Sequence, residues 1–254
     1  MLNCNVPVTP YNLLDNSDFS NPIAQAGLNG IHGSMKYVCD RWISWDADAT
    51  FGSGYITPGS PIDQHLSKTV VDINKTYTAA ICLSDGTIKA ESGTFSNGFG
   101  SYALGIYCMK QEDSTDYVTV RLNTGNNIRW AALYEGSYTA PTLPAYQPKG
   151  YAAELAECQR YYRTMSYPVI PCANNPAGTQ VYGFLPFVMR IASPTVSYDT
   201  LYFFKGDSTF VSVSSASAAS YGAGMRIVFN LSQSVEGNLA GAVAGNGITL
   251  NANL

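Results

Sequence analysis

Charged side chains are scarce in this sequence. Of its 254 residues, 13% are Asp, Glu, Lys or Arg, about half the share that is usual in a globular protein. The formal net charge is −4, so the chain has no excess of basic groups to displace counterions from nucleic-acid phosphates. We therefore expect no nucleic-acid binding. A surface covered by Ser, Thr, Asn, Gly and Tyr suits burial in an assembly or contact with neutral, polar ligands.

Long apolar runs are also missing, although hydrophobic residues make up 46% of the chain and can fill a large core. No run reaches the eighteen or so residues that a transmembrane helix needs, so we expect no membrane insertion. The opening, MLNCNVPVTPYN, has neither the basic stretch nor the apolar segment of a signal peptide. We expect synthesis in the cytoplasm without a signal peptide.

Metal-binding spacings are absent as well. The six cysteines are scattered, with no CxxC pair and no His at ligand spacing (Cys4, Cys39, Cys82, Cys108, Cys158 and Cys172). This pattern argues against zinc and favours buried free thiols. DADATFGSG and QEDSTD contain oxygen ligands of the kind that calcium prefers, but neither matches an EF-hand loop. Asp46 and Asp48 are weak candidates for a structural calcium, and we expect no other cofactor.

Catalytic motifs are equally sparse. The two histidines, His32 and His65, lie in Gly- or Ser-rich stretches and neither accompanies a GxSxG motif, so we expect them in surface loops. A glycosidase needs two carboxylates facing each other across a sugar. Asp46 and Asp48, or the acidic residues of 112–116, lie beside turn-like residues, where carboxylates are normally solvated. We expect that the protein is not an enzyme.

Alternation of period two dominates the rest of the chain. Residues 117–123 (YVTVRLN) and 224–232 (GMRIVFNLS) place apolar side chains at every second position, as half-buried strands require. Residues 77–95 are typical of two strands joined by a tight turn at Asp85 and Gly86. Because Pro and Gly recur between such runs, the sequence predicts an all-β fold built from β-sandwiches.

One stretch, ELAECQRYYR (residues 154–163), changes period. Apolar residues recur there at helical offsets (Tyr151, Leu155, Cys158 and Tyr162), with acidic residues near the start and basic ones near the end, as the helix dipole favours. Prolines flank this stretch on both sides. It predicts a short connector helix within residues 149–165.

The connector helix divides the chain into two predicted β-sandwich domains. Residues 1–148 form the first domain and residues 166–254 the second. The second contains stretches rich in Gly, Ala and Ser, at 214–224 and 237–254. These are either flexible loops or places where small side chains let strands or subunits approach closely near a symmetry axis.

Four motifs together resemble a known family. In chain order they are NLLDNSDFSNPIAQAG (12–27), DRWISW (40–45), ELAECQRYYR (154–163) and GFLPFVMRIASPTVSY (183–198). This order is similar to that in distal tail-fibre or baseplate (receptor-binding) proteins of bacteriophages and prophages. In that family the Asn-rich opening and Asp-Arg-Trp begin a carbohydrate-binding-like jelly roll, the CQRYY segment closes it, and the last motif opens the tip.

The resemblance implies a virion structural protein, made in the host cytoplasm. It further implies a homotrimer, attached to other tail or baseplate proteins, that adheres to a bacterial surface glycan. Two alternatives stay open. One is a purely structural baseplate, head-fibre or capsid-decorating subunit without a ligand, and the other is a carbohydrate-binding module of a glycan-degrading system.

Aromatic residues supply the candidates for sugar binding, because flat rings stack on the apolar faces of sugars. Alternation in DRWISW places Trp42 and Trp45 on opposite faces, and the resemblance makes Trp42 the structural one. Trp45 is therefore the first candidate, followed by Tyr134, Tyr138 and Trp130.

Candidates for a subunit interface come from the second half of the chain. Arg and Tyr often anchor protein interfaces. We therefore expect Arg160 and Tyr161 of the helical segment, and Arg190 of the last motif, to contribute to subunit contacts.

Overall fold

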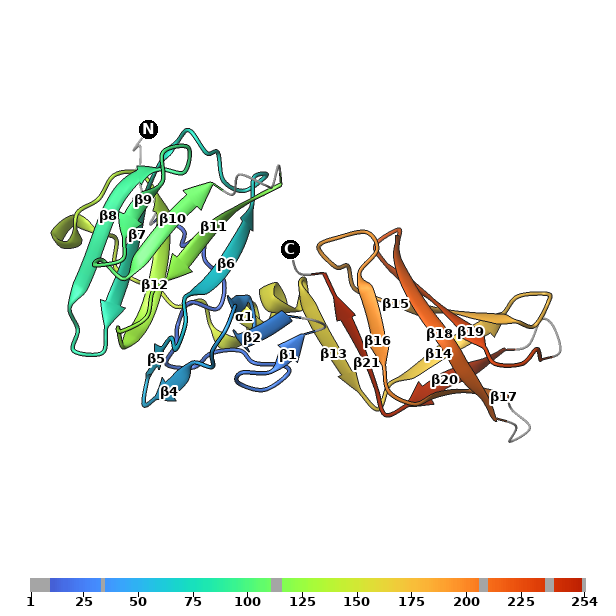
Figure 1. Cartoon of the computed structure of the whole chain (residues 1–254). Coiled ribbons are helices and arrows are strands. Elements are labelled where there is room, and N and C mark those ends of the chain that lie inside the picture. The colour runs from blue at the N-terminus through green and yellow to red at the C-terminus, as the bar shows by residue number, and fades with distance from the viewer. Residues whose placement is uncertain (1–9, 33–34, 111–115, 206–209, 236–239, 253–254) are drawn as a thin grey trace, which may run out of the picture. The chain divides into compact units, whose positions relative to one another are not determined.

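Antiparallel strands make up nearly all of the regular secondary structure in this computed structural model, which describes residues 10–32, 35–110, 116–205, 210–235 and 240–252 (Figure 1). These ranges contain one α-helix, α1 (Tyr151–Gln159), and one 3₁₀ helix, η1 (Ala140–Thr142). The prediction of an all-β protein is confirmed. No helix in the described part of the chain is long and apolar enough to cross a membrane.

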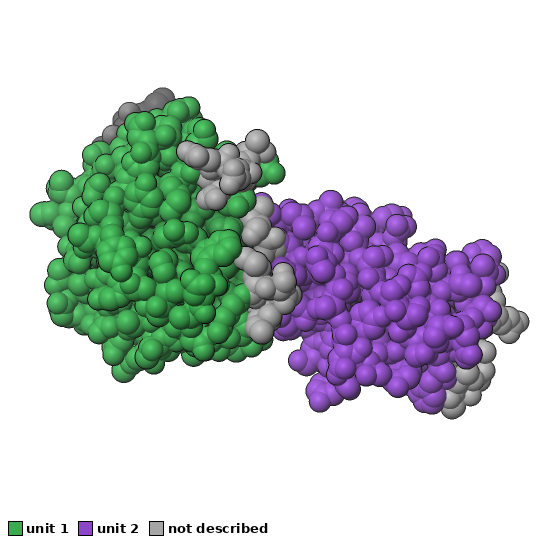
Figure 2. Space-filling model, in the orientation of Figure 1, with its two compact units in different colours: residues 1–155, 254 green, residues 156–253 purple. Residues whose placement is uncertain are grey.

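The chain forms two compact units, residues 1–155 with residue 254 and residues 156–253 (Figure 2). In the first unit, a 7-stranded sheet has the order β1 (Ile31–His32), β2 (Met35–Cys39), β3 (Trp42–Ser44), β6 (Ile62–Ser67), β11 (Tyr117–Leu122), β10 (Ile106–Lys110) and β9 (Phe99–Ser101). A 5-stranded sheet has the order β4 (Thr50–Gly52), β5 (Tyr55–Thr57), β12 (Ile128–Glu135), β7 (Thr76–Leu83) and β8 (Ile88–Thr94).

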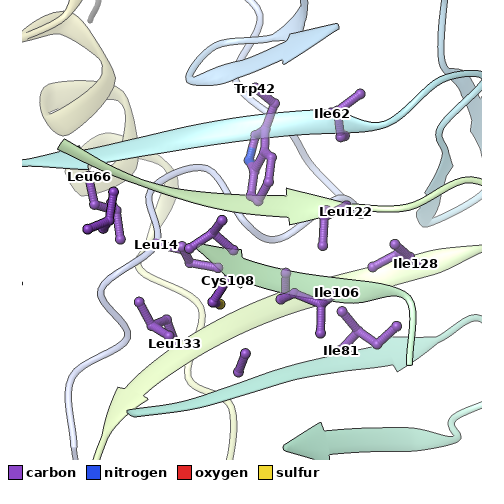
Figure 3. Packing of buried hydrophobic residues seen from close by; sticks show 14 of the residues in the cluster. Leu14, Trp42, Ile62, Leu66, Ile81, Ile106, Cys108, Leu122, Ile128 and Leu133 are labelled. Atoms are coloured by element: carbon purple, nitrogen blue, oxygen red, sulfur yellow. The ribbon is translucent and has the colours of Figure 1, made fainter. Parts of the chain in front are cut away.

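One hydrophobic core takes side chains from both of these sheets. Ile62 and Leu122 of the 7-stranded sheet share it with Ile81 and Ile128 of the 5-stranded sheet (Figure 3). Val118, Val120 and Leu122 are buried, as the alternation predicts, but Thr119 between them is buried as well. Each fully buried side chain of this size stabilises the fold by roughly 1.5–3 kcal/mol, so this shared core holds the two sheets together.

The predicted hairpin at Asp85 and Gly86 is confirmed. β7 and β8 pair over their whole length, and Gly86 has a φ of +88°, which only Gly adopts at little cost. The Asp85 carboxylate accepts a hydrogen bond from the Thr87 N–H at 2.8 Å. This side chain therefore stabilises the turn.

The Asn-rich opening has a structural role that centres on Asn16. The side chain of this buried residue donates to the carbonyl oxygens of Ile23 (2.8 Å) and Asp40 (2.6 Å) and accepts from the Ile23 N–H (2.7 Å). The Asn16 carbonyl accepts a hydrogen bond from Nε1 of Trp42 at 2.8 Å. Asn16 has a φ of +49°, a conformation that Asn tolerates better than most residues.

The other residues of Asp-Arg-Trp bind the same opening segment. Asp40 accepts hydrogen bonds from the Gln25 N–H (3.0 Å) and Nε2 (2.7 Å). Arg41 pairs with Asp15 at 3.3 Å and donates to the His65 carbonyl at 2.8 Å. Its φ of +72° is unfavourable for a residue with a Cβ, so these bonds hold it in place. Each of the three residues thus contacts at least one residue of the opening motif.

The segment before and within α1 joins this cluster. Lys149 lies 3.0 Å from the Asp15 carboxylate, and the Glu154 carboxylate accepts a hydrogen bond from the Asn16 N–H. Two cations therefore share Asp15, which is 8% exposed. Pairing on both oxygens offsets the cost of burying this carboxylate.

The helix is shorter than the predicted 149–165 connector. α1 ends at Gln159, and residues 162–166 form a strand, β13 (Tyr162–Ser166), that pairs with β21 (Gly247–Asn251). Tyr151, predicted on the apolar stripe, is 57% exposed, whereas Cys158 is buried. Tyr162 therefore lies in a strand that pairs with a distant part of the chain, although its spacing from Cys158 also suits a helix.

The second unit is a closed six-stranded barrel, not the predicted sandwich. Its strand order is β14 (Val169–Asn174), β15 (Gln180–Leu185), β19 (Gly224–Leu231), β18 (Phe210–Tyr221), β17 (Leu201–Lys205) and β20 (Ala240–Gly245). A 3-stranded sheet of β13, β21 and β16 (Thr195–Tyr198) accompanies it. Phe203, Ile227 and Phe229 of the barrel share one core with Ile248 and Leu250 of this sheet.

Most of the described part of the two small-residue stretches belongs to strands, so the flexible-loop interpretation is wrong there. Residues 214–221 lie in β18 and residues 240–245 in β20. A Cβ on Gly241 would lie 2.2 Å from the Phe204 carbonyl oxygen and 2.7 Å from the Phe203 ring. A glycine is therefore required where β20 approaches β17 closely.

We expect Asn16→Ala to lower the free energy of unfolding of the first unit by about 2–4 kcal/mol, because buried backbone groups of Ile23 and Asp40 lose their partners. Urea unfolding followed by tryptophan fluorescence reports on this unit, since all three tryptophans lie there. Asn21→Ala, at an exposed position, is the matched control and should change little. Equal stability of the two variants would contradict the role given to Asn16.

We also expect stability to fall as the pH rises through about 6. Burial raises the pKa of Asp40 to about 6, although the hydrogen bonds from Gln25 lower it. The unfolded pKa is about 3.9, so the folded state binds this proton more tightly. The proton on Asp40 therefore stabilises the folded state by roughly 2–3 kcal/mol. This stabilisation is fully present below about pH 4 and is lost as the pH rises through about 6. Asp40→Asn should abolish this loss in urea unfolding at a series of pH values, whereas Asp46→Asn should retain it.

Candidate functional site

Trp45 is the most exposed tryptophan of the chain and is held by a hydrogen bond. Its side chain is 55% exposed, whereas Trp42, which begins β3, is fully buried. The prediction that Trp42 packs in the core is therefore confirmed. Nε1 of Trp45 donates to Oδ2 of Asp63 at 2.8 Å. This hydrogen bond fixes the orientation of the indole, while much of the ring system stays exposed to solvent.

Asp63 connects Trp45 to a cation. This buried residue of β6 accepts two hydrogen bonds from Arg121 of β11, one on each carboxylate oxygen and each 2.7 Å long. Strand register explains the geometry, because Asp63 pairs directly with Ile43 of β3 on one side and Arg121 on the other. The hydrogen bond to Asp63 raises the pKa of Arg121 above its ordinary value, so the guanidinium stays protonated.

We call Trp45, Asp63 and Arg121 the Trp45 surface. Its charges are paired: the buried carboxylate is neutralised by a guanidinium whose side chain is 33% exposed. A bidentate pair of this kind is rigid as well as strong. The surface therefore offers a flat apolar ring beside N–H groups, with no uncompensated charge on Asp63.

Sequence reasoning identified Trp45 but missed Asp63 and Arg121. Both occupy the polar positions of alternating strands, where solvent exposure is the ordinary expectation. The available signal was the placement of an acidic residue in IDQHLS and a basic one in YVTVRLN, two runs of similar length. Only the strand pairing shows that these residues are neighbours.

Tyr134 is a wrong candidate, because it is 2% exposed and its ring face is not available to a soluble ligand. Trp130 is partly buried, and Tyr146 stacks on it with ring centroids 4.5 Å apart and planes 1° apart. One face of that indole is therefore occupied. Tyr138 is partly buried next to Gly136. Trp130 and Tyr134 belong to β12 of the 5-stranded sheet, whereas Asp63 and Arg121 beside Trp45 belong to the 7-stranded sheet.

The interface candidates Arg160, Tyr161 and Arg190 lie together in the second unit. The Arg190 guanidinium lies 5.6 Å from the centre of the Tyr161 ring, and the Arg190 N–H donates to the Arg160 carbonyl at 2.7 Å. Arg160 also pairs with Glu157 at 3.2 Å. The structure thus brings these three predicted residues into one cluster.

The calcium candidates Asp46 and Asp48 do not belong to a metal-binding cluster among the described residues. Asp46 and Asp48 are exposed, and the Asp48 carboxylate contacts Lys36. The described ranges contain no group of three or more His, Cys, Asp or Glu side chains that could hold a metal ion. Residues 112–115 of the second acidic stretch fall outside those ranges.

The remaining reactive side chains are mostly buried. His65 lies in β6 and stacks on Tyr117 with ring centroids 4.3 Å apart, so its predicted place in a surface loop is wrong. The backbone of His32 belongs to β1. Five cysteines are free and buried, as predicted, and Cys4 lies outside the described residues. Burial raises the pKa of Cys172 to about 11, which makes its thiol unreactive near neutral pH.

Comparisons of this chain with models of protein families, with curated proteins and with solved structures give no match. The function is therefore inferred from the motifs and from the geometry described above.

Proposed function

We propose that this protein is a bacteriophage structural protein at the tip of a tail fibre or baseplate, and that it binds a bacterial surface glycan. The observation that carries the proposal is the exposed Trp45 indole, fixed by the Asp63–Arg121 pair. Aromatic rings of this kind, accompanied by a few placed polar groups, are typical of sugar-binding sites.

The electrostatics of the Trp45 surface favour a neutral glycan. The apolar face of a pyranose ring stacks on the indole, while its hydroxyls accept hydrogen bonds from the exposed part of Arg121. Because Asp63 neutralises Arg121, an anionic group gains little there. The low charge content of the whole chain agrees with a neutral, hydroxyl-rich ligand.

The fold of the first unit supports the same proposal. Two antiparallel sheets of 7 and 5 strands enclose one core, and we propose that they form the jelly roll that the opening motif and Asp-Arg-Trp imply. The contacts of Asn16 with Asp40 and Trp42 give these two motifs a joint structural purpose. The order of the four motifs supports the proposed place in the virion.

A homotrimer would make shallow sites effective. One Trp45 surface per chain binds a glycan weakly, and linked sites raise avidity by about 10²–10⁴. The cluster of Arg160, Tyr161 and Arg190 is our candidate for the subunit contact. Planar, hydrogen-bonding side chains of this kind often anchor interfaces.

We expect Trp45→Ala to weaken glycan binding about tenfold or more, because the stacking surface is lost. The free energy of unfolding should change by no more than about 1 kcal/mol, because the side chain is largely exposed. A bacterial glycan array followed by calorimetry on the best ligand measures the affinity.

Tyr102→Ala removes a ring that is 65% exposed elsewhere on the first unit and is the matched control. Equal affinity of the Trp45 variant and the wild type would refute the site assignment. If the wild-type protein binds no bacterial glycan but is present in a virion, the purely structural alternative holds.

We expect the purified protein to have about three times the chain mass of 27.3 kDa. Size-exclusion chromatography with light scattering measures this mass over a range of concentrations. Arg190→Ala should shift the distribution towards single chains if the cluster with Tyr161 lies in the interface. A mass of one chain at every concentration would exclude the homotrimer.

A further inference from the structure

An aromatic groove lies on the outer wall of the barrel of the second unit. It has a volume of about 370 Å³ and is lined by residues of β14, β15, β18 and β19 (Pro171, Tyr182, Gly183, Phe184, Tyr221 and Arg226). We call it the Arg226 groove. It belongs wholly to the second unit, whereas the Trp45 surface belongs wholly to the first.

Strand alternation places aromatic rings in this groove. Val181 and Leu185 of β15 are buried in the barrel core, so Tyr182 and Phe184 between them point outwards. Their side chains are 37% and 51% exposed, and Tyr221 at the end of β18 is 62% exposed. Three rings that are held on one rigid wall without burial indicate a surface for a ligand.

A cation lies close to two of these rings. The guanidinium carbon of Arg226 is 5.8 Å from the Tyr182 ring centre and 5.9 Å from the Tyr221 ring centre. Both distances suit cation–π attraction, which orients the guanidinium. Arg226 is exposed, and none of the ion pairs among the described residues involves it. Unlike Arg121, it keeps its full charge for an external partner.

Polar side chains fix one wall of the groove. The Tyr182 hydroxyl donates to Gln180 at 2.9 Å, and Gln180 donates to Asn230 at 2.8 Å. Asn230 in turn donates to Ser215 at 2.7 Å. This chain of hydrogen bonds holds the Tyr182 ring in place before a ligand arrives, which lowers the ordering cost of binding.

We propose that the Arg226 groove binds a saccharide that carries a carboxylate on its ring, as a uronic acid does. The sugar ring stacks on Tyr182 or Tyr221, and the carboxylate accepts two parallel N–H···O bonds from Arg226. A carboxylate attached directly to a ring carbon lies at the edge of the stacked sugar, within reach of a guanidinium that is 5.8 Å from one tyrosine ring centre and 5.9 Å from the other. A phosphodiester, which lies between sugar units, fits this arrangement less well.

The charge distribution along the chain agrees with an anionic ligand at this unit. Residues 156–253 contain five basic and four acidic residues, whereas residues 1–155 contain nine basic and fourteen acidic ones. An anion is therefore repelled less by the second unit than by the first. The two units would thus select saccharides of different charge.

The test uses the full chain and three probes: an oligomer of galacturonic acid, its neutral methyl ester and an oligomer of glycerol phosphate. Calorimetry gives the affinities, and NMR chemical shifts locate the binding site. We expect Arg226→Gln to weaken binding of the uronic acid about tenfold and to leave the weak binding of the methyl ester unchanged. Arg226→Lys should recover only part of the affinity, because a lysine cannot form the bidentate pair.

Three controls separate this groove from other sites. Arg129→Gln removes one exposed positive charge from the first unit, and Tyr202→Ala removes a ring that is 40% exposed on β17. Neither change should alter uronic-acid binding. Trp45→Ala should also leave it unchanged, so failure of the glycan proposal for the first unit would not affect this result.

Several outcomes would overturn the proposal. They are equal affinity for the uronic acid and its methyl ester, stronger binding of the glycerol phosphate oligomer, and uronic-acid binding that survives Arg226→Gln. If no probe binds and Tyr221→Ala abolishes association between chains, the groove is a subunit contact and the saccharide assignment is wrong.

Discussion

The buried polar cluster around Asn16 is the constraint on which the first unit depends. It connects the opening segment, the turn before β3 and helix α1 through hydrogen bonds to Asp40, Trp42 and Glu154. Buried amides and carboxylates tolerate few arrangements, because each unpaired group costs free energy. The cluster therefore fixes where β3 begins, and Trp45 follows three residues after Trp42. The buried cluster around Asn16 thus determines the position of the exposed Trp45.

Local patterns predicted the elements whose partners are near in sequence. The hairpin at Asp85 and Gly86 and the buried face of residues 117–122 follow from turn chemistry and alternation alone. The barrel and β13 depend on pairing between distant strands, for example Tyr162 with Asn251. Periodicity carries no information about such partners. A Tyr at a helical offset is equally suited to a strand, and tertiary pairing decided its conformation.

The candidate site was likewise predictable only where local sequence patterns determine it. Alternation placed Trp42 and Trp45 on opposite faces, and the resemblance selected Trp42 as the buried one. Because all three residues of β3 are buried, alternation alone does not distinguish the two rings. Asp63 and Arg121 were not predictable, since their contact depends on the register between β6 and β11. Tyr134 was chosen as an aromatic candidate for an exposed site, but β12 extends to Glu135 and the ring is buried. Strand ends are therefore the least certain feature of such sequences.

The two proposed ligand surfaces differ in one physical respect. Both present aromatic rings that hydrogen bonds hold in place, through Asp63 for Trp45 and through Gln180 for Tyr182. In the Trp45 surface the nearby guanidinium is neutralised by a buried carboxylate, whereas Arg226 lies near two tyrosine rings and forms none of the ion pairs among the described residues. Neutral aromatic rings leave the charge of the Arg226 guanidinium uncompensated, so Arg226 can form a full ion pair with an anionic ligand. The presence or absence of one carboxylate therefore determines whether such a surface favours neutral or acidic sugars.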